Sequence, residues 1–85
     1  MAYNFLMFKN VEIYSKSNCP FCDKAKNYFT QNEIPFVAHD AEIPEVFNVL
    51  MTRNPYARTM PQIFIDDVLI GGYTDLEEWL ANNKD

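Results

Sequence analysis

Two cysteines lie close together in Ser17-Asn18-Cys19-Pro20-Phe21-Cys22-Asp23, and the 85-residue chain contains no others. An apolar, β-prone run, Val11-Glu12-Ile13-Tyr14, precedes this segment, and a helix-like run from Phe21 to Gln31 follows it. The pattern predicts a strand that delivers Cys19 to the start of a helix. Pro20 fits that position, because the first helical turn does not need its missing N–H.

The predicted position of Cys19 favours a reactive thiolate. The unpaired N–H groups at the start of a helix and the positive end of its dipole stabilise a thiolate relative to a thiol. Lys16, three residues upstream, adds a nearby cation. Cys22 follows about one helical turn later, with its sulfur on the same side. We therefore expect redox chemistry, with Cys19 as the nucleophile.

Other interpretations of the cysteine pair are weaker. A zinc site needs two more ligands, and only His39 remains as a further nitrogen or sulfur ligand. A structural disulfide across two intervening residues constrains almost no chain entropy. Two buried, inert cysteines are disfavoured, because Pro20 at a strand–helix junction predicts an exposed pair. His39 itself is expected at the end of a strand rather than as a catalytic base.

The composition predicts one globular domain spanning residues 1–85. Apolar residues make up 48% and aromatic residues 15% of the chain, which is typical of a packed rather than a disordered protein. A chain of this length buries a single modest core. The net charge of −5 and the lack of a basic cluster disfavour nucleic acid and anionic membranes as partners.

The first eight residues, Met1-Ala2-Tyr3-Asn4-Phe5-Leu6-Met7-Phe8, are mostly apolar. They lack the basic start and the small-residue cleavage site of a secretory signal, and they are too few to span a bilayer. The sequence leaves open whether they extend the first strand or pack as an arm. One Cys-x-x-Cys pair without further cysteines is typical of a reducing compartment, so we expect a cytoplasmic protein.

Two further elements follow the first helix. Glu33-Ile34-Pro35 ends that helix, and Phe36-Val37-Ala38-His39 has the pattern of a short second strand. A strand, a helix and a strand this close together predict a right-handed parallel unit. Pro44 fits the first turn of a second helix that runs to about Arg53, and Asn54-Pro55-Tyr56 ends it.

The last third of the chain predicts two strands and a helix. Pro61–Ile65 and Val68–Gly71 are separated only by Asp66-Asp67, which predicts an antiparallel hairpin. Thr74-Asp75-Leu76-Glu77 matches the S/T-x-x-E capping box and predicts a third helix with Thr74 as its N-cap. The order is β-α-β-α-β-β-α. We expect an α/β protein with one four-stranded mixed β-sheet flanked by three helices.

Three separated segments together resemble a glutaredoxin of the dithiol type. They are Cys19-Pro20-Phe21-Cys22, Thr59-Met60-Pro61-Gln62-Ile63-Phe64-Ile65 and Gly71-Gly72-Tyr73-Thr74-Asp75. The resemblance runs from about Val11 to the C-terminus. It implies a thioredoxin-like fold, a cis peptide bond before Pro61 beside the cysteines, glutathione as the reductant, and no metal.

The resemblance also implies a glutathione site. The backbone of Met60 would pair with the cysteinyl part of glutathione, and Thr74 and Asp75 would receive the γ-glutamyl end at a helix N-terminus, where both can also cap the helix. Lys16 and Arg58 are candidates for the glycyl carboxylate. The full candidate set is Lys16, Phe21, Arg58, Thr59, Met60, Pro61, Gly72, Tyr73, Thr74 and Asp75.

The chain departs from the family pattern at two of these positions. Phe21 stands where tyrosine is commonest, so that position has no hydroxyl, although the ring can still shield the sulfur. Met60 stands in place of the usual valine and softens the wall of the groove. These departures leave the substrate preference open.

The function implied by the resemblance is a glutathione-dependent thiol–disulfide oxidoreductase. Cys19 would attack a protein disulfide or a glutathione mixed disulfide, and Cys22 or glutathione would resolve the intermediate. The implied partners are glutathione and disulfide-containing or glutathionylated proteins, with ribonucleotide reductase among the candidates, and the protein is expected to be a monomer.

Two alternative functions remain open. The first is a module in which Cys19 and glutathione from two protomers hold an iron–sulfur cluster. Pro20 and Cys22 weigh against it, because cluster carriers usually have Gly and Ser at these positions. The second is a redoxin reduced by thioredoxin reductase, which Lys16 and the Thr74-Asp75 pair argue against.

Overall fold

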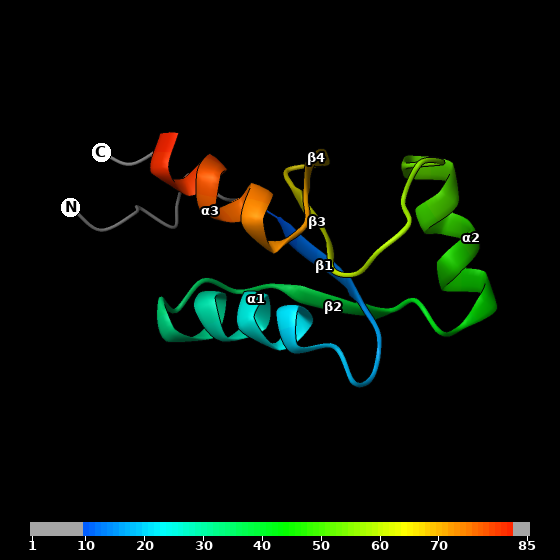
Figure 1. Ribbon diagram of the computed structural model, residues 1–85, viewed down its shortest axis with the longest axis horizontal. Helices are drawn as coiled ribbons and strands as arrows, with labels where there is room; N and C mark the ends of the chain where they lie inside the picture. Colours follow the sequence, from blue (N-terminus) through cyan, green and yellow to red (C-terminus); the bar gives the residue numbers. More distant parts are fainter. Residues whose placement is uncertain (1–9, 83–85) are drawn as a thin grey trace.

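The seven elements occur in the predicted order in the computed structural model, which describes residues 10–82 (Figure 1). Their bounds are β1 Val11–Ser15, α1 Pro20–Gln31, β2 Val37–Asp40, α2 Pro44–Arg53, β3 Gln62–Ile65, β4 Val68–Gly71 and α3 Tyr73–Asn82. The open question about residues 1–8 lies outside the described residues. None of the helices within residues 10–82 has the length and apolarity that a membrane span requires.

The four strands form one mixed sheet in the order β2-β1-β3-β4. β1 runs parallel to β2 and antiparallel to β3, so that Ile13 lies opposite Ala38 on one side and Ile63 on the other. β3 and β4 form the predicted antiparallel hairpin. Its two turn residues, Asp66 and Asp67, have φ values of 51° and 68°. Positive φ at both central residues is the geometry of a type I′ turn, which matches the twist of a hairpin.

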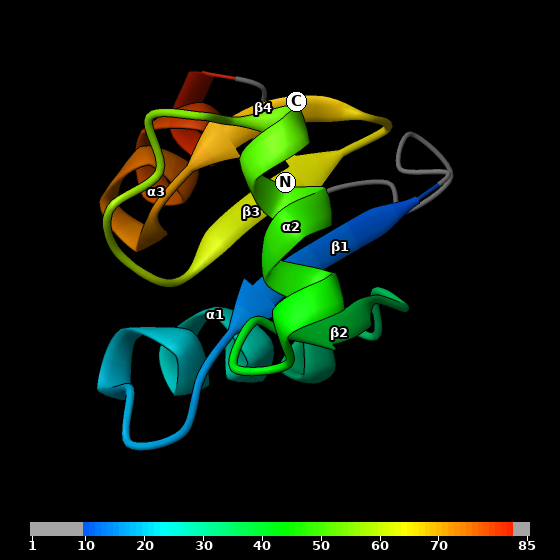
Figure 2. The same ribbon diagram turned by 90° about the vertical axis from the view of Figure 1, so that its right-hand side faces the viewer.

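Helices cover both faces of the sheet. Figures 1 and 2 show α1 and α3 on one face and α2 on the other. Successive residues of a strand point to opposite faces, so Ile13 and Tyr14 belong to different core clusters. The larger cluster, with α1 and α3, contains Val11, Ile13, Ala25, Phe29, Ile34, Ile63, Ile65, Leu76 and Leu80. The smaller cluster, with α2, contains Tyr14, Ala41, Leu50 and Phe64. This arrangement confirms the thioredoxin-like fold.

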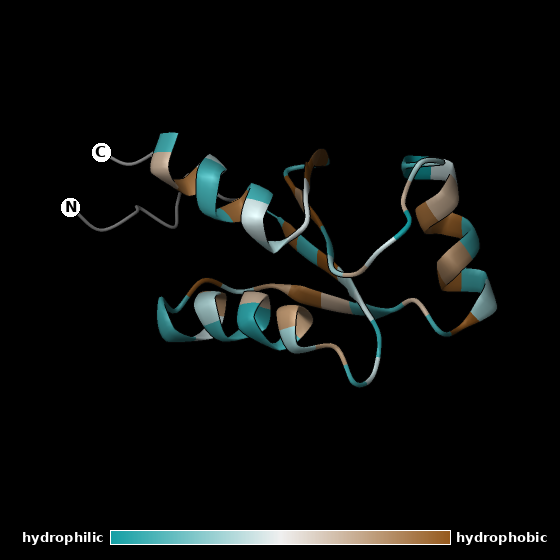
Figure 3. Cartoon of the chain, viewed as in Figure 1, coloured by the Kyte–Doolittle hydropathy of each residue, from teal (hydrophilic) through white to brown (hydrophobic). Residues whose placement is uncertain are grey.

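Hydrophobic residues follow the central strands in Figure 3, and they also occur along α2. The side chains of Phe47 and Val49 in α2, and of Ile43 just before it, are exposed. Leu50 is the residue of this helix that is buried against the sheet. The outer surface of α2 is therefore partly apolar.

The start of α3 differs from the prediction. The helix begins at Tyr73, and the N–H of Leu76 donates to the carbonyl oxygen of Gly72 at 2.9 Å, which makes Gly72 the N-cap. The Asp75 carboxylate accepts from the N–H of Gly72 at 3.0 Å. The predicted capping box with Thr74 as the N-cap is therefore wrong by two residues. Asp75 supplies the reciprocal half of the cap, and Gly72 has no side-chain oxygen to supply the other half.

Two strands differ by one residue from their predicted bounds. β3 begins at Gln62 rather than at Pro61, because proline has no N–H for the ladder. β2 spans Val37–Asp40 rather than Phe36–His39. The register of β1 explains the second shift, since Ser15 of β1 pairs with Asp40.

Candidate active site

Cys19 is the N-cap residue of α1. Its backbone is extended, with φ −126° and ψ 95°, and Pro20 takes the first helical position, as predicted. The preceding residue, Asn18, has a φ of 53° and turns the chain from β1 into the helix. The N–H of Cys22 donates to Cys19 Sγ at 3.2 Å. An N–H aimed at this sulfur, together with the helix dipole, stabilises negative charge on Cys19 when the pair is reduced.

The two cysteines form a disulfide, with 5.2 Å between their Cα atoms. Cys22 is fully buried, whereas Cys19 keeps 7% of its surface exposed. The expectation of an exposed pair is therefore wrong. The cause lies in the helix, which places Cys22 on the same inward face as Ala25 and Phe29. Cys19 is nevertheless the more accessible of the two residues, which fits its predicted role as nucleophile.

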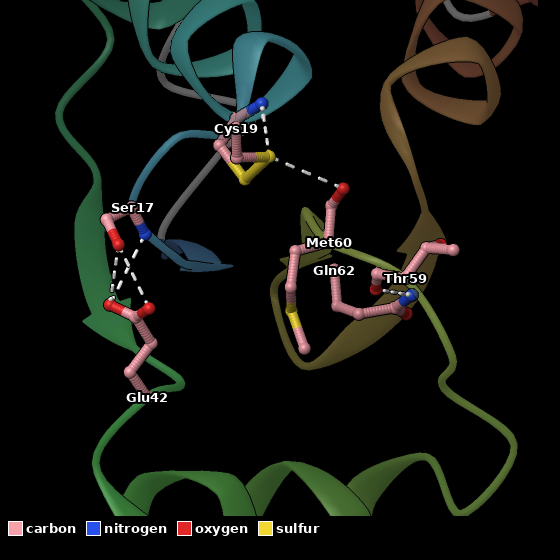
Figure 4. The surroundings of a disulfide bond; sticks show 7 residues. Ser17, Cys19, Glu42, Thr59, Met60 and Gln62 are labelled. Carbon is pink, nitrogen blue, oxygen red and sulfur yellow. Dashed lines mark hydrogen bonds between the residues drawn. A yellow bond between two sulfur atoms is a disulfide. The ribbon is translucent and has the colours of Figure 1, made fainter.

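A cis peptide bond joins Met60 to Pro61, as the resemblance implied. This segment faces the cysteines across the start of α1, and the carbonyl oxygen of Met60 lies 3.6 Å from Cys19 Sγ (Figure 4). The loop that carries Met60 connects α2 to β3. We call residues 54–60 the groove loop. Residues that are 41 positions apart in the chain thus form the immediate surroundings of the reactive sulfur.

A groove of about 590 Å³ lies next to the cysteines. One wall is the groove loop, and the other is formed by the start of α1 and the junction of β4 with α3. The lining residues are Phe21, Asn54, Tyr56, Ala57, Arg58, Thr59, Met60, Pro61, Gln62, Leu69, Gly71, Gly72, Tyr73, Thr74 and Asp75. Nine of the ten candidate glutathione residues are among them.

Lys16 is the candidate that the structure does not bring to this groove. It lines a separate hollow of about 280 Å³ together with Lys26, Asp40 and Glu42. Arg58, the other candidate for the glycyl carboxylate, does line the groove. The groove therefore brings one of the two predicted cations to its wall.

Gly71 makes room for the Asp75 carboxylate. Gly71 has a φ of 119°, a conformation that residues with a side chain rarely adopt, and a Cβ atom built there would collide with the Asp75 side chain. The carboxylate occupies this space and accepts from the N–H of Gly72. The helix-capping role of Asp75 is thereby confirmed.

Lys24 contacts two aromatic rings at the rim of the groove. Its Nζ lies 5.1 Å from the ring centroid of Phe21 and 5.9 Å from that of Tyr73. The two ring centroids are 6.2 Å apart. A cation over aromatic faces at these distances stabilises the arrangement. Sequence reasoning did not find this contact, because Tyr73 is 49 residues beyond Lys24 and no local pattern links them.

Glu42 holds the loop that leads to Cys19. Ser17 Oγ donates to Oε1 and Oε2 of Glu42 at 3.1 and 2.9 Å, and the N–H of Ser17 donates to Oε1 at 3.4 Å (Figure 4). Sequence reasoning missed this residue as well. A glutamate after a short strand carries no signal that it will reach a serine 25 positions earlier.

His39 belongs to a polar cluster under α2, as expected for a residue near the end of a strand. Its Nε2 lies 3.0 Å from Glu12, and its ring lies 4.7 Å from that of Tyr14. Arg53 donates to both oxygens of Glu12 at 2.9 and 3.0 Å. These hydrogen bonds from Arg53 hold the pKa of the Glu12 carboxyl below its usual range. Within residues 10–82, no group of three or more His, Cys, Asp or Glu side chains is placed to hold a metal ion.

A disulfide-bonded cysteine pair at a helix start, opposite a cis proline on a mixed four-stranded sheet, defines a thiol–disulfide oxidoreductase of the thioredoxin-like fold. The glutaredoxin family model matches residues 11–70. The chain belongs to the glutaredoxin family.

Individual relatives agree with this assignment. Glutaredoxin 3 of Escherichia coli K12 is 39% identical over 71 residues, which cover 79% of this chain and 81% of that protein. The crystal structure of glutaredoxin 1 from Francisella tularensis, complexed with cacodylate, is 34% identical with a TM-score of 0.67 and covers 86% of this chain and 92% of that one. The crystal structure of a buckwheat glutaredoxin–glutathione complex is 23% identical with a TM-score of 0.73 and covers 87% and 70%. The last similarity establishes the shared fold.

Proposed function

We propose that the protein is a glutathione-dependent oxidoreductase that reduces glutathione mixed disulfides and protein disulfides. The observation that carries the proposal is the position of Cys19 Sγ, beside the Met60 carbonyl at the edge of a groove that contains nine candidate glutathione residues. Cys19 is the nucleophile and Cys22 the resolving cysteine. We place the reaction in the cytoplasm, with the protein acting as a monomer in a single domain.

With a glutathionylated substrate, the Cys19 thiolate attacks the sulfur of the glutathionyl group. The Cys19–glutathione disulfide forms, and the substrate leaves as a thiolate. A second glutathione thiolate attacks the bound glutathionyl sulfur, which releases oxidised glutathione and restores the Cys19 thiolate. Each cycle consumes one free glutathione, and the oxidised glutathione that leaves joins it to the glutathionyl group taken from the substrate.

With a protein disulfide, the same attack joins Cys19 to one sulfur of the substrate and frees the other as a thiolate. The Cys22 thiolate then attacks Cys19 Sγ and releases the second substrate thiolate. This leaves the Cys19–Cys22 disulfide, which is the state of the structure. Two glutathione molecules reduce it, and a separate NADPH-dependent reductase restores them.

The groove supports glutathione as the ligand through the chemistry of its walls. A peptide-like ligand can pair with the backbone of Met60, while the N-terminus of α3 offers unpaired N–H groups to the γ-glutamyl carboxylate. The Asp75 carboxylate already accepts from Gly72, and it has further lone pairs for the ligand's ammonium. Arg58 is the favoured partner of the glycyl carboxylate, because Lys16 lies in a different hollow.

A coupled assay tests the proposal directly. The purified protein is given a glutathionylated peptide, glutathione, glutathione reductase and NADPH, and NADPH oxidation is followed. The proposal predicts turnover that requires glutathione and Cys19. A parallel reaction replaces glutathione and its reductase with thioredoxin reductase. Turnover only in that second reaction would make the protein a thioredoxin-reductase-dependent redoxin, and an absorbing iron–sulfur chromophore after anaerobic expression would favour the cluster-binding alternative.

A further inference from the structure

Gln62 is a buried polar residue that forms part of the wall of the groove. It is 6% exposed and, within residues 10–82, shares this degree of burial with only one other polar side chain, Ser15. It is the first residue of β3, directly after Pro61. It lies opposite Tyr14 in the pairing of β1 with β3, on the face of the sheet that α2 covers. Burying an amide there is unfavourable unless its hydrogen bonds are made.

Both ends of the Gln62 amide are bonded to the groove loop. Nε2 donates to the carbonyl oxygen of Thr59 at 2.9 Å, and Oε1 accepts from Asn54 Nδ2 at 3.1 Å. Figure 4 shows the Gln62 side chain reaching back to Thr59 beside Met60. One side chain of the sheet thus contacts the loop near its beginning and near its end.

Asn54 extends this connection along the loop. Its Oδ1 accepts from the N–H of Tyr56 at 3.2 Å, and its carbonyl oxygen accepts from the N–H of Ala57 at 3.1 Å. The hydrogen bonds of Asn54 hold the backbone of Tyr56 and Ala57, and the hydrogen bond of Gln62 holds the backbone of Thr59. The groove loop is thus fixed on both sides of Arg58. Asn54 and Gln62 are not among the candidate glutathione residues, whereas Thr59, which Gln62 holds, is one of them.

Packing fixes only part of the same loop. Ala57 and Met60 pack against the core cluster under α2. Tyr56 is 85% exposed, and Arg58 and Thr59 are exposed as well. On one side of Arg58, Ala57 is held both by packing and by its hydrogen bond to Asn54. On the other side, the exposed Thr59 is held by its hydrogen bond to Gln62.

We propose that Gln62 is a positioning residue for ligand binding. By holding the Thr59 carbonyl and Asn54, it places the backbone of the groove loop, and Arg58 on it, at the distance that a glutathionyl ligand needs. The inference rests on the proposed function, because it takes the glutathionyl group as the ligand. Gln62 acts on the affinity of the groove and leaves the thiol chemistry of Cys19 unchanged, since Met60 is also held by its own packing.

Gln62→Glu is the sharpest test because the substitution keeps the shape of the side chain. One carboxylate oxygen still accepts from Asn54, but the other faces the Thr59 carbonyl without a proton. The Michaelis constant for a glutathionylated peptide should rise about fivefold at pH 7, which corresponds to about 1 kcal/mol for a lost hydrogen bond. The kcat and the rate at which iodoacetamide alkylates reduced Cys19 should stay within about twofold of wild type.

The pH dependence separates positioning from a general structural loss. When the new carboxyl is protonated, it can again donate to the Thr59 carbonyl. The ratio of the variant's Michaelis constant to that of wild type should therefore fall towards one between about pH 7 and about pH 4.5. Taking the ratio at each pH cancels the titration of Cys19, which both proteins share. A ratio that does not change with pH would overturn the positioning role.

Two further variants complete the experiment. Gln31→Glu makes the same chemical change at an exposed position of α1 and should leave the Michaelis constant unchanged. Asn54→Asp removes the amide that donates to Gln62 but retains an acceptor for the N–H of Tyr56. It should reproduce the rise in the Michaelis constant, and it is the deciding variant if Gln62→Glu fails to fold. Unchanged Michaelis constants in the folded variants would overturn the role of Gln62 alone. A wild-type protein that does not turn over the peptide would instead overturn the proposed function.

Discussion

Cys19 Sγ and the carbonyl oxygen of Met60 lie 3.6 Å apart, although the two residues come from opposite halves of the chain. The first stands at the start of α1, and the second precedes a cis proline that leads into β3. Under the proposed function, a substrate whose sulfur is attacked by Cys19 lies along the backbone of Met60. This relationship brings the reactive atom and the binding groove together.

The first prediction concerns the reactivity of Cys19. The reduced Cys22→Ser variant should show a thiolate whose pKa is below that of an ordinary cysteine, because the helix start and the N–H of residue 22 stabilise its charge. Absorbance near 240 nm followed against pH measures this titration. The reduced Cys19→Ser variant is the comparison, since its remaining thiol is fully buried. If Cys22 titrates at the lower pH, the roles of the two cysteines are reversed.

The second prediction separates the two reactions of the cysteine pair. Cys22→Ser should keep or gain activity on a glutathionylated peptide, because glutathione can resolve that intermediate and the competing internal disulfide is no longer formed. The same variant should lose most of its activity on a protein disulfide, where the internal thiol has a high effective concentration.

Both assays for that prediction use the same protein preparations, with glutathione and its reductase supplied. Cys19→Ser should be inactive in both and serves as the control. If Cys22→Ser is inactive in both assays, the pair acts only as an obligate dithiol. Activity of Cys19→Ser in either assay would contradict the assignment of the nucleophile.

The third prediction concerns the two roles of Asp75. Asp75→Ala should raise the Michaelis constant for glutathionylated substrate by a factor equivalent to about 1–3 kcal/mol, if a hydrogen bond to the ligand's charged ammonium is lost. It should also lower the melting temperature, because the N–H of Gly72 loses its acceptor. Glu78→Ala, an exposed change on the same helix, is the control. A lower melting temperature with an unchanged Michaelis constant would leave Asp75 with the capping role alone.

The fourth prediction concerns acid stability. The pKa of Glu12 is lowered chiefly by its hydrogen bonds to Arg53, so the folded state binds a proton there less readily than the unfolded chain. The stabilisation is complete above the carboxyl pKa of the unfolded chain, about 4.3, and it is lost as the pH falls through the lower folded value. Glu12→Gln should reduce stability at neutral pH and flatten this loss.

Chemical denaturation between neutral and acidic pH measures that effect. Glu45→Gln, an exposed change at the start of α2, is the matched control and should keep the wild-type pH dependence. If Glu12→Gln and wild type lose stability in parallel as the pH falls, the ion pair with Arg53 does not contribute to acid sensitivity.

The fifth prediction concerns Gly71. Gly71→Ala should destabilise the protein by about 1 kcal/mol or more, because the residue has a positive φ and the new Cβ meets the Asp75 carboxylate. The double variant Gly71→Ala with Asp75→Ala removes the collision, so its loss of stability should be smaller than the sum of the losses of the two single variants. A loss equal to that sum would show that backbone conformation alone requires glycine at this position.

The order of the elements and the position of Cys19 could be predicted because their causes are local. Apolar runs, Pro20 at a helix start and the Asp66-Asp67 turn each act over a few residues, and the structure confirms all three. The predicted start of α3 was wrong because two overlapping capping patterns compete there, one from Thr74 to Glu77 and one from Gly72 to Asp75. The turn at Gly71, which no local rule predicts, decides in favour of Asp75.

The contacts that shape the site could not be predicted, because they join elements that only the fold brings together. Gln62 meets Asn54, Ser17 meets Glu42, and Lys24 lies over Tyr73. None of these pairs has a characteristic spacing. The burial of Cys22 could not be predicted for the same reason, since it depends on how α1 packs against the sheet. Only the family resemblance pointed to the nine candidate glutathione residues that line the groove.

The end of α2 connects the polar cluster around Glu12 with the groove loop. Arg53 donates to Glu12 and Tyr14 of β1 and to Asp67 of the β3–β4 turn, while Asn54, the next residue, begins the groove loop and bonds to Gln62. Residues 53–62 therefore behave as one interlocked module. A designer who wishes to transfer the ligand preference of another scaffold onto this protein should exchange that whole module. Exchanging only its exposed residues would retain Asn54 and Gln62, whose hydrogen bonds fit the present backbone of the loop.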